Sequence, residues 1–596
     1  MTAHEALKTY FGYDNFRPLQ EEIIQSVLDG RDTLALMPTG GGKSLCFQVP
    51  TMAMSGLCLV ITPLIALMKD QVENLRRRDI RAAAIYTGMT YEQQKVALDN
   101  CQWGPYHFLY VSPERLESEE FRERLARLPI CLIAVDEAHC ISQWGYDFRP
   151  SYLKIAEIRE VIRGERQTGD EARRQAVPIL ALTATATPDV VDDIQERLTF
   201  REKNVLRKSF LRQNLSYVVR QTNKKADEIV HILSKVPGSA IVYVRNRQRA
   251  QELAAYLNEK GLSADFYHAG LTSKERAAKQ EAWRAYPHPL PKGKGVTRVM
   301  VSTNAFGMGI DKPDVRMVIH HDLPDTIEAY FQEAGRAGRD EQRAFAVLLY
   351  DPSQDKAKAR KRIADNYPPK EFVTDVYHKS CDFLGVGAGS GQGHTFMLPI
   401  NDLCRIMHLP ILQTYSALHL LTQAGYICFQ EEQEIQPRVK ILISQREMNE
   451  YGFSEQQYKL LELLMRKYSG IFTDLQYVHF DQLTTPITNS PSPMANRQSL
   501  DDLLVSLAQR HIITYIPHDT ANTLTFTRER QTDIYLPTTI YDNHRQQYIE
   551  KLKAMVEYAD NQLYCRSQLL LSYFGETDAT TCGTCDVCRQ KTKTQR

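Results

Sequence analysis

The sequence lacks any long apolar run. No stretch of it approaches the ~18 apolar residues of a membrane-spanning helix. The first residues, MTAHEALKTYFGYDN, also lack the charged-then-apolar order of a secretory signal. Composition is otherwise ordinary for a folded protein, with 43% hydrophobic and 24% charged residues. We therefore expect a cytoplasmic protein without a membrane partner, associated with the nucleoid if its source is bacterial.

The sequence also lacks a net charge of either sign, because its basic and acidic residues nearly cancel to +1 at pH 7. Bulk charge therefore does not indicate a nucleic-acid partner, and any basic surface must be local. The length of 596 residues predicts about four domains.

Cysteines suited to a disulfide framework are missing as well. Eight of the twelve lie scattered between Cys46 and Cys428, mostly in apolar runs, and are expected to be buried in a reducing compartment. The other four crowd the C-terminus with the spacing C-x16-C-x2-C-x2-C: Cys565, Cys582, Cys585 and Cys588. Four thiolates at this spacing fit a tetrahedral structural Zn²⁺. The alternative, a redox CxxC pair, would leave two of the four unexplained.

A phosphate-binding loop is predicted near the N-terminus. The strand-length apolar run Thr33–Met37 leads into a polar, glycine-rich segment and then into a segment able to begin a helix. The polar segment contains Thr39, Gly40, Gly41, Gly42, Lys43 and Ser44. Glycines let backbone N–H groups turn toward phosphate oxygens. Lys43 would reach the β- and γ-phosphates of ATP, and the Ser44 hydroxyl would bind Mg²⁺. Met37 stands where the usual first glycine is expected, and a flexible surface loop is the alternative.

Residues 1–205 alternate strand-like runs with helical stretches. The runs are Thr33–Met37, Leu57–Ile61, Ala82–Tyr86, Phe108–Ser112, Cys131–Val135 and Ile179–Thr183. Such apolar strands predict a parallel sheet covered on both faces, with ligands at the carboxyl ends of the strands. Asp136 and Glu137 follow one of these ends. Asp136 suits a Mg²⁺ ligand and Glu137 could orient or deprotonate the attacking water; the alternative is an acidic helix start.

A second α/β set begins at Ser239–Val244 and contains a further strand at Thr297–Thr303. It closes with QEAGRAGRD, residues 332–340, in which Arg336 and Arg339 are three residues apart. Two arginines on one helical face could approach the γ-phosphate from a facing domain. The alternative is a pair of solvated arginines.

The segment after Glu137, HCISQWGYDFRPSY, is rich in aromatic residues. It holds Trp144, Tyr146, Phe148, Arg149 and Tyr152. Aromatic rings with arginine are the groups on which nucleic-acid bases stack. A packed aromatic loop is the alternative interpretation.

By these motifs the chain resembles the RecQ family of superfamily-2 helicases, over residues 1 to about 352 and again from about 541 to 590. Its Leu7, Phe11-Gly12, Phe16-Arg17 and Gln20 match the family's adenine-reading motif. The resemblance implies that Gln20 contacts adenine while Tyr13 and Arg17 stack on the ring. An amide side chain suits the N6 and N7 atoms of adenine.

The resemblance also gives roles to the other motifs. The segment around Trp144 is similar to the RecQ aromatic-rich loop, which senses single-stranded DNA and couples it to ATP hydrolysis. The QExGRxGRD frame matches the helicase pattern, which implies that Arg336 and Arg339 act across the domain boundary. The string CR…LL.YFGE…CGTCDVC resembles the RecQ zinc module.

For residues 353–540 the resemblance gives no guide, and the elements are predicted only from the pattern of apolar, polar and turn-forming residues. The segment Gly385–Gly393 predicts a flexible loop or linker. The order helix, turn, helix and two-stranded wing, characteristic of a winged helix, is predicted from Ile400–Met407, Leu412–Ala424, Tyr426–Phe429 and Arg438–Ile443. Any small α+β unit is the alternative. A second such unit is predicted from Glu455–Tyr468, Phe472–Leu483, Ser499–Gln509 and Ile512–Tyr515, with a loop at Thr484–Asn496.

This order departs from the resembled family, which usually places the zinc module directly after the second motor domain. Here residues 353–540 intervene. Only eight residues follow Cys588, so we expect no HRDC domain.

Together these features predict an α/β protein with two RecA-like parallel-sheet motor domains, α+β winged-helix-like units and a C-terminal helical zinc-binding module. The expected boundaries are 1–205 and 206–352 for the motor domains, 353–540 for the winged-helix-like region and 541–596 for the zinc module.

The expected function is that of a DEAH-box, ATP- and Mg²⁺-dependent DNA helicase that moves 3′ to 5′ on single-stranded DNA, acts on forked duplexes and serves DNA recombination and repair. The alternatives are an ATP-gated clamp or remodeller of nucleic acid that separates no strands, and an RNA helicase. The sequence identifies no protein partner.

Overall fold

The structure is a computed structural model, which divides into two compact units: residues 1–361 with 546–596, and residues 362–545. It describes every residue except 39, 64, 87, 88, 90, 143–148, 167–176, 288–295, 308–311, 436, 445, 446, 448–450, 469, 473–475, 479–496, 511, 517, 518, 595 and 596. Within the described part of the chain, no helix is both long and apolar enough to cross a bilayer.

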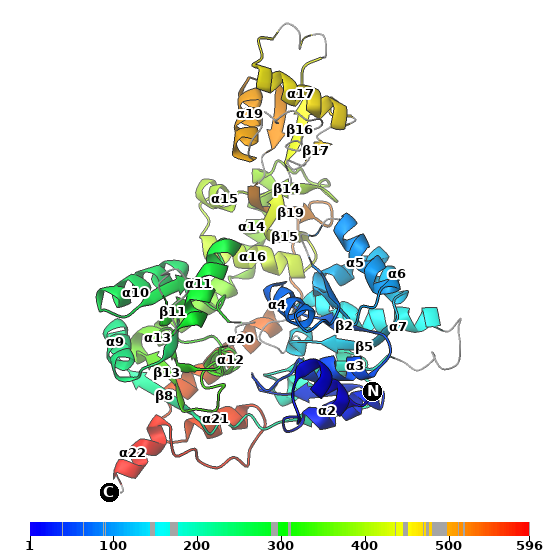
Figure 1. Ribbon diagram of the computed structural model, residues 1–596. Helices are drawn as coiled ribbons and strands as arrows, with labels where there is room; N and C mark the ends of the chain where they lie inside the picture. The colour runs from blue at the N-terminus through cyan, green and yellow to red at the C-terminus, as the bar shows by residue number, and fades with distance from the viewer. Residues whose placement is uncertain are drawn as a thin grey trace. The chain divides into compact units, whose positions relative to one another are not determined.

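The first sheet of the larger unit is formed from the N-terminal part of the chain (Figure 1). Its strands are β1 (Thr33–Leu36), β2 (Leu57–Ile61), β3 (Ala82–Ile85), β4 (Phe108–Val111), β5 (Ile130–Val135), β6 (Ile179–Thr183) and β7 (Val205–Arg207). The order is β3-β4-β2-β5-β6-β1-β7, and every pairing is parallel. All six runs predicted as strands are confirmed.

Helices cover this sheet and connect its strands. They are α1 (Ala3–Ala6), α2 (Gln20–Leu28), α3 (Leu45–Ala53), α4 (Ile65–Arg76), α5 (Tyr91–Trp103), α6 (Glu119–Ala126), α7 (Lys154–Arg166) and α8 (Pro188–Arg197), with short turns η1 (Leu7–Phe11), η2 (Pro113–Glu117), η3 (Ala138–Ile141) and η4 (Pro150–Leu153). Strands β1, β2, β4 and β6 are buried along their whole length, as strands with helices on both faces must be.

The second sheet of the same unit is also wholly parallel, in the order β10-β11-β9-β12-β13-β8. Its strands are β8 (Leu215–Gln221), β9 (Ser239–Tyr243), β10 (Ala264–Tyr267), β11 (Val299–Ser302), β12 (Val315–His320) and β13 (Ala344–Tyr350). Its helices are α9 (Lys225–Lys235), α10 (Arg247–Glu259), α11 (Ser273–Ala285), α12 (Ile327–Ala334) and α13 (Pro352–Asn366). The two predicted strands, β9 and β11, are confirmed, and the sequence analysis missed the other four.

The C-terminal helices are α20 (Asp542–Asp560), α21 (Arg566–Tyr573) and α22 (Asp586–Thr594). Of the four clustered cysteines, Cys565 directly precedes α21, Cys582 and Cys585 lie between α21 and α22, and Cys588 lies in α22. The Phe574 ring lies 5.0 Å from that of Phe331 in α12 and 5.3 Å from that of Phe210. The rings of Tyr558 and Tyr330 are 5.4 Å apart. The zinc-module residues from Gln546 onward therefore pack on the second motor sheet, although residues 362–545 separate them in sequence.

The smaller unit contains two three-stranded sheets. Its elements are α14 (Lys370–Phe383), β14 (Thr395–Met397), α15 (Ile400–Ile406), α16 (Ile411–Gln423), β15 (Ile427–Ile435), β16 (Arg438–Ile441), α17 (Glu455–Lys467), β17 (Gln476–Tyr477), α19 (Arg497–Gln509), β18 (Ile513–Ile516) and β19 (Asp519–Phe526). The sheet orders are β14-β19-β15 and β17-β16-β18. The predicted loop Thr484–Asn496 lies outside the described residues.

The predicted wing of this unit is wrong in its pairing. The predicted wing pairs β15 with β16, but β15 pairs antiparallel with β19, from Ile427↔Phe526 to Ile435↔Asp519. Strand β16 pairs instead with β17 and β18. The physical reason is that the two strands serve different cores: Ile427 and Phe429 pack in one, Val439 in the other. The second small fold is thus inserted between two strands of the first.

The glycine-rich segment Gly385–Gly393, predicted as a flexible loop or linker, is a loop, and backbone hydrogen bonds hold it to the rest of the smaller unit. Gly393 N donates to Phe526 O at 2.8 Å, and Arg530 N donates to Ser390 O at 2.8 Å. These backbone bonds hold the segment against the end of β19 and the residues that follow it.

Candidate functional site: an ATP cleft and a four-cysteine cluster

The phosphate loop lies between β1 and α3. Gly40 and Gly42 both have φ of +81°, a left-handed conformation that side chains rarely adopt. A Cβ on Gly41 would lie 2.9 Å from the Pro38 carbonyl oxygen. A side chain at any of the three positions would therefore strain the backbone or clash with it. Met37, in place of the usual first glycine, is fully buried, and Thr39 lies outside the described residues.

The residues predicted to read adenine surround this loop. Gln20 is 1% exposed and its Nε2 donates to Gly42 O at 3.0 Å, while its Oε1 accepts from Arg17 N at 2.9 Å. Arg17 Nη1 donates to Gly40 O at 2.9 Å. Tyr13 is half exposed at the edge of the same cleft. Gln20 and Arg17 thus fix the loop, and their contact with adenine stays a prediction.

Asp136 and Glu137 follow β5 at the same edge of the sheet. Burial and the Glu137 carboxylate raise the pKa of Asp136 to about 6, against the opposing effect of Lys43. Burial alone would raise the pKa of Glu137, but Lys43, His139 and Arg336 outweigh it and leave that pKa below its usual value. Among the residues that the structure describes, Glu137 is thus placed among cations that keep it ionised.

His139 connects this pair to the neighbouring strand. Its Nδ1 lies 2.9 Å from Thr183 Oγ1 at the end of β6 and 3.3 Å from Glu137 Oε2. The ring is 2% exposed. His139 therefore links the Glu137 carboxylate to the end of β6 by side-chain contacts.

One cleft of about 800 Å³ brings these motifs together. Its lining includes Tyr13, Arg17, Gln20, Gly40, Gly42, Lys43, Ser44, Asp136, Glu137, Arg336 and Arg339. Every described residue of the predicted ATP site is in that set except Gly41, which lies within the loop itself. Residues predicted from segments far apart in the sequence thus share one site.

The two arginines enter the cleft from the second motor sheet. Arg336 is 5% exposed, donates from Nη1 to Gly307 O, and has an Nε without a hydrogen-bond partner among the described residues. A Cβ on Gly40 would lie 3.3 Å from Arg339 Cγ, so the stem of Arg339 lies against the phosphate loop. The described residues therefore leave one buried donor of Arg336 unsatisfied.

The aromatic segment is only partly described. Trp144, Tyr146 and Phe148 lie outside the described residues, and Arg149 N donates to Cys140 O at 2.8 Å. Tyr152 is fully buried and its Oη donates to Asp136 O at 3.0 Å. The interpretation of Tyr152 as one of the stacking aromatics is therefore wrong: its hydroxyl fixes the backbone of a cleft residue.

Sequence reasoning missed a contact across the cleft. Arg284 Nη2 in α11 lies 4.0 Å from Asp70 Oδ2 in α4, and both residues line the cleft. No signal in the sequence marks it, because Arg284 stands at the end of an ordinary amphipathic helix.

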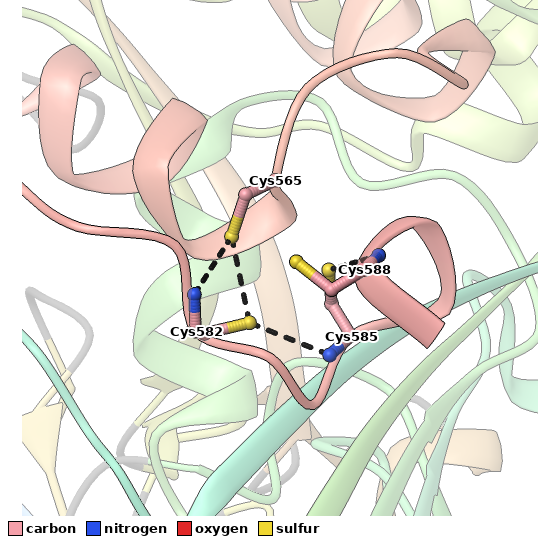
Figure 2. A group of neighbouring side chains, drawn as sticks. All are labelled: Cys565, Cys582, Cys585 and Cys588. Carbon is pink, nitrogen blue, oxygen red and sulfur yellow. Dashed lines mark hydrogen bonds between the residues drawn. The ribbon is translucent and has the colours of Figure 1, made fainter. Parts of the chain in front are cut away.

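The four C-terminal cysteines converge, as Figure 2 shows. Their Sγ atoms all lie within 4.8 Å of one another, and Cys565 Sγ is 3.4 Å from Cys582 Sγ. Tetrahedral Zn–S bonds of ~2.3 Å place sulfur atoms about 3.8 Å apart. Within the described residues, this is the one His, Cys, Asp or Glu group found with metal-ligand spacing. The donor set therefore fits structural zinc.

Backbone N–H groups point at three of the four sulfur atoms of the cluster. Backbone N–H groups of Cys582, Cys585 and Cys588 each donate to the sulfur of a preceding cysteine at 3.3–3.4 Å. The hydrogen bond from Cys585, partly opposed by burial, lowers the pKa of Cys582 to about 3. The pKa of Cys585 is raised, chiefly by its hydrogen bond with Cys582, and burial raises that of Cys588. The convergence of four sulfur atoms, which a redox pair would leave half unexplained, is therefore what favours zinc.

Family models match three parts of the chain. The DEAD/DEAH box helicase model matches residues 17–194, the helicase conserved C-terminal domain matches 224–341, and the RecQ zinc-binding model matches 521–589. Each of these parts carries one group of residues described above.

Curated relatives agree with these matches. The chain is 41% identical over 353 residues to the ATP-dependent DNA helicase RecQ of Haemophilus influenzae, covering 59% of this chain and 54% of that protein. It is 40% identical over 353 residues to the probable ATP-dependent DNA helicase RecS of Bacillus subtilis, covering 58% and 66%. A solved structure, the DUF1998 helicase MrfA bound to DNA, has a TM-score of 0.48 at 19% identity over 60% of this chain and 50% of that chain. The chain spans about half to two thirds of the length of these curated relatives, and it belongs to the RecQ family of superfamily-2 helicases.

Proposed function

We propose that this chain is an ATP-dependent DNA helicase that translocates 3′ to 5′ on single-stranded DNA and unwinds forked duplexes in recombination and repair. The observation that carries the proposal is the shared cleft. Phosphate-loop and acidic residues from the first motor sheet face Arg336 and Arg339 from the second. A site completed by two domains links hydrolysis to their relative movement.

In this proposal each cleft residue has a role. Lys43 neutralises the β- and γ-phosphates, and Gln20 with Tyr13 and Arg17 receives the adenine base. Glu137 orients or deprotonates the attacking water, a role supported by the cations that keep it ionised. Ser44 and Asp136 would hold Mg²⁺, which when bound neutralises charge on the phosphates. Arg336 and Arg339 stabilise charge that develops on the γ-phosphate.

DNA would be sensed by the aromatic segment. Trp144, Tyr146, Phe148 and Arg149 are the proposed stacking and backbone contacts. Support comes from the buried bond between Tyr152 Oη and Asp136 O, which ties the end of this segment to the acidic pair. DNA bound to the aromatic segment would move Asp136 and Glu137, because the chain to Tyr152 and the hydrogen bond from Tyr152 Oη to Asp136 O connect the two.

We further propose that residues 1–205 and 206–352 are the two motors, 353–540 a pair of winged-helix-like units and 541–596 the zinc module. The first unit is supported by the element order α14, β14, α15, α16, β15 and β19 with the sheet order β14-β19-β15. Its recognition-helix position, α16, contains no Lys or Arg, and the sequence of β15 contains three Glu residues. The absence of basic residues in α16 and the acidic residues in β15 argue against these two elements binding the DNA backbone through its phosphates.

Strand displacement tests the proposal. A duplex with a 3′ single-stranded tail should be separated only with ATP and Mg²⁺, and a matched duplex with a 5′ tail should stay paired. The alternative function, an ATP-gated clamp or remodeller, predicts DNA-stimulated ATP hydrolysis without release of a strand from either substrate. Equal stimulation of hydrolysis by RNA and DNA would instead favour the RNA helicase.

A further inference from the structure

One short segment connects the two motor sheets. This motor linker, residues 208–214, leaves β7 of the first sheet and enters β8 of the second. Lys208 N donates to Leu36 O at 2.9 Å. Leu36 is the last residue of β1, which leads into the phosphate loop. The linker therefore begins beside the nucleotide site.

The far end of the motor linker holds the segment that carries the cleft arginines. Arg212 Nη2 donates to Gly338 O at 2.6 Å and to Ala337 O at 3.0 Å. Asn214 Nδ2 donates to Gly338 O at 2.7 Å. Gly338 has φ of +62°, and a Cβ there would lie 2.6 Å from Asn214 Nδ2. The linker thus fixes the backbone between Arg336 and Arg339.

The middle of the motor linker is held by the zinc module. Glu576 Oε1 accepts from Phe210 N at 2.7 Å, and Glu576 Oε2 accepts from Ser209 Oγ at 2.7 Å. The Phe210 side chain is 1% exposed, with ring centroids 5.3 Å from Phe574 and 5.9 Å from Phe331. Both carboxylate oxygens are therefore used on two consecutive linker residues.

Glu576 is itself fixed by the zinc-module fold. It follows α21, where Gly575 has φ of +85°, and its backbone N donates to Leu571 O at 2.8 Å. In sequence it lies between Cys565 and Cys582, two of the four clustered cysteines. Its carboxylate is consequently positioned by the same local fold that gathers the thiolates.

We propose that Glu576 is a positioning residue for ATP hydrolysis. It holds the motor linker in the conformation in which Arg212 and Asn214 place Arg336 and Arg339 opposite the phosphate loop. The zinc module then does more than stabilise the chain, because it sets the geometry in which the two motors close. The inference rests on the proposed function, since it assigns these arginines to the reaction.

The test compares Glu576→Ala with Asp578→Ala. Asp578 is exposed in the same loop, so its removal deletes the same charge without a linker contact. Both variants should keep the parental zinc content and melting temperature and bind a fluorescent ATP analogue with parental affinity. Glu576→Ala alone should lower kcat about tenfold, because both charge-assisted hydrogen bonds to the linker are lost and part of their effect reaches the arginines. Combining it with Arg212→Ala should lower kcat no further than the larger single effect, because both act through the linker.

A second measurement does not depend on turnover. Fluorophores at exposed Glu92 in α5 and Glu259 in α10 report the distance between the motors. Glu576→Ala should broaden that distance distribution with the ATP analogue bound, while Asp578→Ala should match the parent.

The results that would overturn this inference differ from those that would overturn the proposed function. A zinc-loaded Glu576→Ala with parental kcat and parental distances overturns the inference, and so does a kcat loss that only parallels lost zinc. A parent protein that hydrolyses no ATP instead overturns the proposed function, and the distance measurement still tests the linker contact.

Discussion

Replacing Arg336 by alanine tests whether the second motor completes the ATP site. Arg336 is nearly fully buried, comes from the residues just after α12 and is near enough to Glu137 to help lower the pKa of that carboxyl. Its Nη1 is occupied by Gly307 O, whereas its Nε has no partner among the described residues. The guanidinium therefore supports the Gly307 backbone and retains one buried donor that the described residues leave unsatisfied.

The expected loss of kcat follows from the proposed role of Arg336 at the γ-phosphate. A trans-acting arginine contributes on the order of 10³ to 10⁵ in kcat for phosphoryl transfer. ATP binding uses residues of the first motor, so the affinity for ATP should change little while kcat falls by about three orders of magnitude or more. Arg336→Lys keeps a charge but loses the planar fork, and we expect it to recover only a small part of the rate.

The assay is steady-state ATP turnover with saturating single-stranded DNA, with nucleotide affinity measured separately by fluorescence. Arg343→Ala is the matched control, because Arg343 is an exposed arginine of the same motor that does not line the cleft. Turnover by Arg336→Ala within a few-fold of the parent would refute the assignment. A parallel loss in Arg343→Ala would show a general effect on the domain.

Four further results are expected. Lys43→Ala should abolish turnover, and Glu137→Gln should still bind ATP but hydrolyse it 10²- to 10⁴-fold more slowly, as loss of a general base predicts; near-parental rates in both would contradict the site. Trp144→Ala should keep basal ATPase but lose its stimulation by DNA, with an affinity loss of ~1–3 kcal/mol for one stacked base; intact stimulation would make the segment a packing loop. Cys585→Ser should yield unfolded or zinc-free protein, because structural zinc contributes on the order of 10 kcal/mol; elemental analysis of the parent should find one zinc per chain. Excising 370–540 should preserve DNA-stimulated ATPase while unwinding collapses, and a folded, zinc-loaded deletion that unwinds at the parental rate would show that the segment separates no strands.

The first motor could be predicted closely from the sequence because its strands are buried on both faces and therefore form unbroken apolar runs. Polar residues after those runs then mark the ligand edge, which places Lys43 and Asp136 in one site. The second motor was predicted less completely. Strand β8 ends in exposed Arg220 and Gln221, and β12 is interrupted by Arg316, so neither shows an unbroken run.

Pairing and burial could not be predicted in the same way. A strand pattern states that β16 exists but not which strand it meets, and the nearest candidate, β15, joins a partner that follows the inserted fold. Composition likewise cannot separate a stacking aromatic from a buried one. Tyr152 is fully buried and its hydroxyl donates to the Asp136 carbonyl oxygen, a contact that no sequence pattern shows.

The smaller unit is inserted without interrupting the motor. The chain leaves the larger unit at Lys361 and returns at Gln546, and the zinc module then packs on the second motor sheet. Within the smaller unit the two ends already meet, since Tyr541 Oη donates to Pro368 O at 2.7 Å and Lys370 Nζ lies 2.7 Å from Asp542 Oδ2. A segment with adjoining ends can be added at one point of a surface without altering the fold around it. The insertion therefore separates the second motor from the zinc module in sequence but not in packing.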